Sequence, residues 1–425
     1  LHGLEEGHHR VLRVPGPQAD HQRLSLGKLV VVEPLHCLHD QLLAGRVGLE
    51  LGKRGRDLSE ENRKQKQVFH ERSGASAAGY PETFRRKTGT FAAPKKRVGD
   101  QSCCPSKIVP RPSKIVNPLI HYEKFTLDNG LRVYVHEDHT TPMAAVNLLY
   151  NVGSRDEDPH RTGFAHLFEH LMFGGSRNIP AYDEPLQKVG GENNAFTSPD
   201  LTNYYITLPA VNLETAFWLE SDRMMALSFD PQVLDVQQKV VVEEFKQRYL
   251  NQPYGDVWLK LRPLAYQHHP YQWATIGKEV GHIENATMQQ VRDFFQKHYS
   301  PANAILVVAG DVTVAEARRL AEKWFGPIPG GTRYERQLPQ EPRQQEARFL
   351  EVAAEVPLSA LYKVYHMPAR GQEGYHAADL LSDLLGRGKS SRLYQQLVKE
   401  RPLFNSISAS VMGSLEPGLL VVSGK

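Results

Sequence analysis

The sequence predicts an α+β protein with mainly antiparallel sheet, and three observations lead to this fold class. Strand-like and helix-like runs alternate in the order β-β-β-α-β-α-α-β after residue 118. Asp128-Asn129-Gly130 joins the first two strands as a hairpin, because Asn-Gly accepts the positive φ angles of a tight turn. With 425 residues, 40% of them hydrophobic and 23% charged, the chain is long enough for two or three domains with cores of their own.

The first unit is expected to cover residues 118–325. Its strands are predicted at 122–127, 131–137, 143–152, 202–208 and 304–309. Its helices are predicted from about Gly163 to the Gly174-Gly175 stop, and then at 212–227, 231–250, 253–266, 288–299 and 314–324.

A linker and a second unit follow. Residues 326–348 are rich in Gly, Pro and polar residues, which is typical of a linker. The second unit, 349–425, is predicted to contain strands near 349–356 and 359–366, helices at 375–385 and 390–399, and strands up to Lys425. Because it stops within an expected strand, we expect this domain to be incomplete.

Residues 1–117 differ from the rest in charge and pattern. They carry 21 Lys and Arg against 12 Asp and Glu, whereas the remaining residues carry 30 against 36. All three cysteines lie here, and the first methionine of the chain is Met143. Because this stretch shows no sustained helical or strand periodicity, we interpret it as a disordered or artefactual extension. The alternative is a basic arm that binds nucleic acid or a membrane surface. We expect no nucleic-acid partner, and no transmembrane segment, since no apolar run approaches about 20 residues.

The stretch His166-Leu167-Phe168-Glu169-His170 is the most informative for function. Histidines four residues apart lie on one face of a helix, so both imidazoles can bind one Zn²⁺. Glu169 shares that face without having to bind the ion. His-x-x-Glu-His is the inverted zincin motif; the competing interpretation is two ordinary histidines on a helix.

A catalytic zinc needs a third protein ligand. The predicted helix 231–250 places Glu243 and Glu244 directly after an apolar run. Adjacent helical residues point about 100° apart, so only one of these carboxylates can share the ion. Spacing alone leaves both open.

With these motifs, the chain from about residue 117 to 425 resembles the pitrilysin/insulinase family of zinc peptidases, which includes the mitochondrial processing peptidase. Its short-chain bacterial branch is the most similar. The matching blocks are 152–157, 163–175, 190–198, 202–205, 240–244, 269–271, 299–304, 309–311 and 388–394. Nine blocks in family order are far more specific than the motif alone.

The resemblance implies two homologous α/β-roll domains with mainly antiparallel sheets flanked by helices, the second domain being truncated here. It implies one zinc ion per chain, bound by His166, His170 and Glu244, with Glu169 as the general base. It also implies an edge strand that pairs with the substrate backbone. The residues of that strand are Asn194, Ala195, Phe196 and Thr197.

Two departures from the family pattern matter. Relatives often have another Glu on the same helix face, seven residues before the third ligand, whereas this chain has Gln237, which can hydrogen-bond a ligand but carries no charge. Where complete peptidases supply an Arg and a Tyr from the homologous half, it has Val398 and Asn405. We therefore expect a partner chain in a heterodimer, or a missing C-terminal half, to supply that pair in a two-half clamshell chamber.

The predicted function is that of a zinc metalloendopeptidase acting on peptides or unfolded segments. The alternative is a non-catalytic scaffold or core subunit of the same family; such relatives usually lose a ligand or the base, and all four residues are present here. The compartment is not determined by the sequence, and the periplasm is the best expectation.

Overall fold

The computed structural model describes residues 28–33 and 120–425, the first of these as backbone alone. The remainder of the predicted extension 1–117 lies outside the described residues, so its lack of structure stays a prediction. Strand β1 (Lys28–Glu33) within it was not predicted. In the part of the chain that the structure describes, no helix has both the length and the apolar character required to cross a bilayer.

Six strands form the first sheet, in the order β2-β3-β7-β4-β6-β5. They are β2 (Glu123–Thr126), β3 (Arg132–Glu137), β4 (Met143–Tyr150), β5 (Glu192–Thr197), β6 (Thr202–Pro209) and β7 (Ala304–Gly310). Every neighbouring pair is antiparallel except β3 and β7, which confirms the predicted α+β class. Because β5 ends the order, one of its edges has no strand partner among the described residues.

The β2–β3 hairpin confirms the predicted turn but not its predicted geometry. Gly130 has φ +89°, whereas Asn129 is not among the residues with positive φ. The Asn129 amide instead donates to the carbonyls of Phe325 and Ile328. Only the glycine is therefore needed for its conformation, and Asn129 ties the turn to the end of the first unit.

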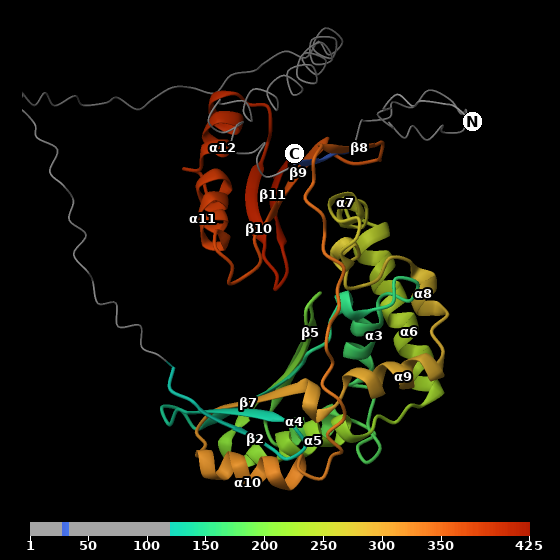
Figure 1. Cartoon of the computed structure of the whole chain (residues 1–425), viewed down its shortest axis with the longest axis vertical. Coiled ribbons are helices and arrows are strands. Elements are labelled where there is room, and N and C mark those ends of the chain that lie inside the picture. Colours follow the sequence, from blue (N-terminus) through green and yellow to red (C-terminus); the bar gives the residue numbers. More distant parts are fainter. Residues whose placement is uncertain (1–27, 34–119) are drawn as a thin grey trace, which may run out of the picture. The chain divides into compact units, whose positions relative to one another are not determined.

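Eight helices of the first unit lie in the described region. They are α3 (Phe164–Leu171), α4 (Asp183–Lys188), α5 (Leu213–Met225), α6 (Pro231–Phe245), α7 (Val257–Ala265), α8 (Val280–Glu284), α9 (Met288–His298) and α10 (Val314–Trp324). Helices α5 and α10 pack on the sheet, while α3, α6, α8 and α9 form a group beside it (Figure 1).

Three of these helices differ from the prediction. The helix expected at 231–250 ends at Phe245 and continues as a wider π turn, Lys246–Leu250. Helices α4 and α8 were not predicted, because six and five residues are too few to show a helical period.

The second sheet has the order β10-β11-β9-β1-β8. Its other strands are β8 (Arg348–Val352), β9 (Ala360–Met367), β10 (Ile407–Met412) and β11 (Gly418–Gly424). The order repeats β5-β6-β4-β7-β3 of the first sheet, with β1 at the place of β7. However, β7 is parallel to β3 and antiparallel to β4, whereas β1 is antiparallel to β8 and parallel to β9. The two units are thus related in strand order but differ at this position.

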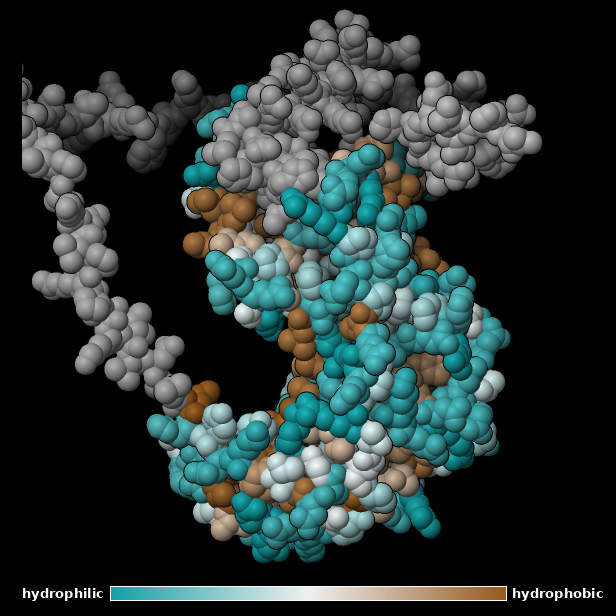
Figure 2. All heavy atoms as spheres, viewed as in Figure 1, coloured by the Kyte–Doolittle hydropathy of each residue, from teal (hydrophilic) through white to brown (hydrophobic). Residues whose placement is uncertain are grey.

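Helices cover both faces of the second sheet. Val364 and Val421 pack with α7, whereas Tyr365 and Val422 pack on α11 (Tyr375–Gly386) and α12 (Arg392–Tyr394). Residues 395–400, expected to continue a regular helix, form a π turn. Burial on both faces explains why β11 is a continuous apolar run rather than an alternating one. The outer side of α11 carries a hydrophobic patch that Figure 2 shows; it includes Leu380 and Leu384.

Candidate metal centre

Helix α3 carries the His-x-x-Glu-His motif and is fixed on its other face. It begins after Gly163, whose φ of +91° is unfavourable for other residues. A Cβ on Gly163 would lie 2.7 Å from the Ile276 carbonyl oxygen, so no side chain fits there. Phe164, Leu167 and Phe168 are buried in the core. The polar side chains of the motif therefore lie on the opposite, more open face, as the helical spacing predicts.

Glu157 caps the beginning of this helix from outside it. Its carboxylate accepts hydrogen bonds from the backbone N–H groups of Gly163 (2.9 Å) and Ala165 (2.8 Å) and from the Trp273 indole (3.2 Å). Burial raises the pKa of Glu157 to about 8, although these donors act in the opposite direction. Sequence reasoning gave this residue no role. The available signal was an acid six residues before a helix-initiating glycine, which has no side chain for capping.

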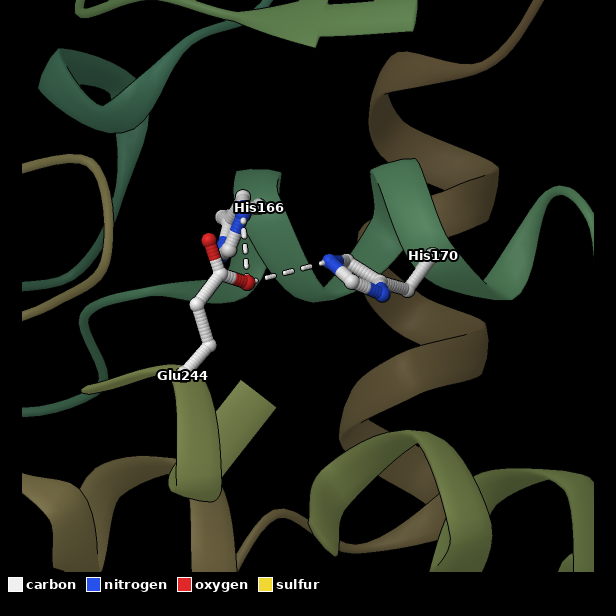
Figure 3. Close-up of side chains that lie close together, drawn as sticks. All are labelled: His166, His170 and Glu244. Carbon is white, nitrogen blue, oxygen red and sulfur yellow. Dashed lines mark ion pairs between the residues drawn. The ribbon is translucent and has the colours of Figure 1, made fainter. Parts of the chain in front are cut away.

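Helix α6 packs against α3 and brings Glu244 to the two histidines. The Glu244 Oε2 atom lies 3.5 Å from Nε2 of His166 and 3.5 Å from Nε2 of His170 (Figure 3). Glu243 instead pairs with Lys246, and its side chain is 59% exposed. The packing of α6 on α3 thus selects Glu244 between the two acids that spacing left open.

The geometry and chemistry of these three side chains fit a zinc ion. Ligand atoms about 2.0–2.1 Å from one ion in tetrahedral geometry lie about 3.4 Å apart, close to the observed separations. The three atoms all lie within 4.8 Å of one another. Burial lowers the pKa of His166 to about 4, so its imidazole is neutral near pH 7, as metal binding requires. Two imidazole nitrogens and one carboxylate oxygen form a donor set used in catalytic zinc sites.

The side chains that contact this group of three differ from the prediction, which placed Gln237 beside Glu244. Arg248 in the π turn binds the other Glu244 oxygen, Oε1, at 2.8 Å. A hydrogen bond with His170, above all, holds the pKa of Glu244 below its usual value. Gln237 is half-buried on α6, and the hydrogen bonds of the described residues include none from its amide to the ligands. Nδ1 of His166 is buried without a hydrogen-bond partner in the same part of the chain.

Glu169 faces the edge strand β5. Its Oε2 atom accepts a hydrogen bond from the Thr197 hydroxyl at 2.5 Å. On the other face of β5, Asn194 and Phe196 are exposed, and the N–H of Ala195 donates to the Asn194 side chain at 2.8 Å. The four residues predicted for substrate binding therefore lie on a sheet edge, and one of them contacts the predicted base.

Comparison with known protein families gives two matches that together cover most of the described residues. Residues 132–278 match the family described as Insulinase (Peptidase family M16), and residues 285–425 match the Peptidase M16 inactive domain. The chain is 35% identical over 290 residues to the zinc protease PqqE of Helicobacter pylori. That alignment covers 66% of this chain and 65% of the relative, so the chain spans about two thirds of that protein's length. It is also 28% identical over 202 residues to a probable mitochondrial-processing peptidase subunit beta of Arabidopsis thaliana, covering 47% of this chain and 38% of that one.

Solved structures give the same assignment. The crystal structure of a protease from H. pylori superimposes with a TM-score of 0.64 at 30% identity, covering 72% of this chain and 75% of that one. A Pseudomonas fluorescens structure described as a peptidase M16 inactive domain matches in fold, with a TM-score of 0.62 at 20% identity over 72% of this chain and 74% of that one. With both domain matches in the predicted order, the chain belongs to the pitrilysin/insulinase family of peptidases, family M16, and to its short bacterial branch.

Proposed function

We propose that this chain is the metal-bearing part of a zinc metalloendopeptidase that hydrolyses peptides or unfolded segments. The observation that carries the proposal is the convergence of His166, His170 and Glu244 from two helices at ligand-to-ligand distances. The zinc-protease names of the relatives agree with it.

Glu169 is the group of this chain that would move the proton. Zinc in such a site polarises a peptide carbonyl and makes a water molecule more acidic. Glu169, three residues after His166 and next to His170, would accept the proton of the attacking water and return it to the leaving amine. Its hydrogen bond from Thr197 orients the carboxylate for both transfers.

The open edge of β5 is the proposed binding place for the substrate backbone. An extended peptide would pair with this edge as an additional strand, and main-chain hydrogen bonds do not depend on sequence. The N–H of Ala195, now bonded to the Asn194 side chain, would exchange that partner for a substrate carbonyl. This predicts broad sequence tolerance, limited by the exposed side chains of Asn194 and Phe196.

A second protein half is proposed to complete the site. In the second unit Val398 packs against the core and Asn405 is exposed. Valine has no hydrogen-bond donor, and the asparagine amide lacks both the charge of Arg and the phenolic hydroxyl of Tyr. A homologous partner chain, or a further C-terminal segment, would supply that pair. Full activity of this chain alone would contradict the proposal, and activity gained only on adding such a partner would support it.

The periplasm is proposed as the compartment. The similar Escherichia coli structure, matched at 22% identity and a TM-score of 0.57, is titled a periplasmic protease, which supports an exported location only by analogy. Fractionation of the native host with antibody detection tests this.

The decisive experiment compares Glu169→Gln with the wild-type chain, with and without the homologous partner. Bound zinc is measured by mass spectrometry and turnover on a quenched peptide library. We expect retained zinc and a loss of turnover of about 10²- to 10⁴-fold. Glu243→Gln is the matched control, because the same substitution then falls on an exposed neighbour of a ligand. Unchanged turnover in Glu169→Gln would overturn the mechanism, and absence of cleavage by the zinc-loaded wild-type pair would favour the scaffold alternative.

A further inference from the structure

Thr197 is the last residue of β5, on the side of the sheet that faces α3. Burial alternates along β5, so Asn193, Ala195 and Thr197 are half-buried while their neighbours are exposed. Thr197 pairs with Thr202 of β6, whose hydroxyl donates to the Val152 carbonyl at 2.9 Å. The strand end is thus anchored to a buried part of the first unit.

We propose that Thr197 is a positioning residue for Glu169, an inference that rests on the function proposed above. In the described part of the chain, the Thr197 hydroxyl is the one group that donates a hydrogen bond to the Glu169 carboxylate. A glutamate has three side-chain torsions, so a half-buried carboxylate without a donor samples several orientations. Threonine, by contrast, is β-branched and stiff at χ1, so the strand backbone fixes where its hydroxyl points.

The consequence is that one strand holds both the base and the substrate. The unpaired edge of β5 is available to a peptide backbone, while the inward side chain at its end fixes the direction of Glu169. A peptide paired with β5 is then in a set register with the carboxylate that moves the proton. The geometry therefore assigns the Thr197 side chain to Glu169 rather than to the substrate, for which it was predicted together with residues 194–196.

The test compares Thr197→Val, which keeps the shape but loses the hydroxyl, with Thr197→Ser, which keeps the hydroxyl. Thr207→Val is the matched control, because Thr207 is an exposed threonine on β6 that pairs with Glu192 at the far end of β5. For Thr197→Val we expect kcat to fall about 10- to 100-fold while KM, zinc affinity and Tm stay unchanged. Thr197→Ser is expected to restore most of kcat, and Thr207→Val to resemble the wild type.

Other results would overturn the assignment. A raised KM with normal kcat would make Thr197 a substrate contact, and a parallel fall in Tm and zinc affinity would make it merely structural. If the wild type cleaves peptide and Glu169→Gln does not, wild-type kcat in Thr197→Val removes this inference but leaves the proposed function intact.

Crystal structures of the wild type and Thr197→Val give a measurement that needs no turnover. We expect the Glu169 carboxylate to adopt several orientations in the variant and one in the wild type. The same single orientation in both would overturn the proposal, even if the protein proved to have no peptidase activity.

Discussion

Helices α3 and α11 hold equivalent places in the two units, yet of the two only α3 contributes to a described group of three side chains close enough to hold one metal ion. Helix α3 follows β4 and packs beside β5, and α11 follows β9 and packs beside β10. Each begins after a glycine with positive φ, +91° at Gly163 and +87° at Gly374. Counted from these glycines, the positions of His166, Glu169 and His170 hold Ala377, Leu380 and Leu381 in α11.

The difference shows that the shared backbone frame supplies no chemistry by itself. Leu380, at the position of Glu169, is 71% exposed, whereas Glu169 is partly buried beside Thr197. Helix α6 packs on α3 and supplies Glu244, whereas Leu380 and Leu384 on α11 remain exposed to solvent in the described part of the chain. A metal centre therefore needs both the motif and a second helix packed at the right distance.

The largest expected effect is the loss of zinc when α3 is made to resemble α11. His166→Ala removes one of the three proposed protein ligands. We expect zinc affinity to fall by more than the 10- to 100-fold that is typical when a residue hydrogen-bonded to a ligand is lost. Chelator competition measures this. The reverse change, Ala377→His with Leu381→His, is the control: it should leave one zinc per chain because α11 lacks a counterpart of Glu244. A second bound zinc would show that the motif alone is sufficient.

Glu157 is expected to make stability depend on pH. Its folded-state pKa of about 8 lies above the ordinary 4.5, so the folded protein retains a proton that the unfolded chain releases between about pH 5 and pH 8. Stability should therefore fall as pH rises through this window. At about 1.4 kcal/mol per pKa unit, the upper limit of this fall is about 5 kcal/mol. Urea unfolding at pH 5.5 and 8.5 should show a fall in the free energy of unfolding in the wild type and not in Glu157→Gln. An equal fall in both proteins would contradict the prediction.

The core beneath the motif is the next difference between the two helices. Leu167 is fully buried, and α11 has Ala378, half-buried, at the same position. Leu167→Ala should destabilise the protein by about 2–5 kcal/mol through lost burial and a cavity. Leu384→Ala on α11 should cost much less, because that side chain is 48% exposed. Equal losses of unfolding free energy in the two variants, measured with denaturant, would mean that α11 is covered by other parts of the protein as α3 is.

The smallest effect is expected at the position in α11 that corresponds to the base. Leu380→Gln replaces a side chain that is 71% exposed, so the free energy of unfolding should change by less than about 0.5 kcal/mol. Zinc content and turnover should not change. A loss of more than about 2 kcal/mol would show that another part of the protein covers this face.

Much of the first unit followed from local sequence signals. Five of the six strands of the first sheet and helices α9 and α10 were predicted within a few residues, because alternation and helical spacing are strong there. Strand β5 was implied only by the family resemblance. Predictions failed where a signal is short or where the backbone changes within a helix. Neither α4 nor the π turn after Phe245 has a pattern that distinguishes it from its surroundings. The direction of β1 in the second sheet depends on its pairing with β8 and β9, which lie more than 300 residues away in the sequence.

The sequence alone determined that His166, Glu169 and His170 share one face, because 3.6 residues per turn fixes the direction of side chains three and four apart. It could not choose between Glu243 and Glu244, nor foresee the contacts of Thr197 with Glu169 and of Glu157 with the start of α3. Thr197 lies 28 positions after Glu169, and Glu157 lies six and eight positions before the N–H groups that it caps, so each contact joins separate elements. Their distances depend on how helices and strands pack, and only the tertiary structure sets that packing.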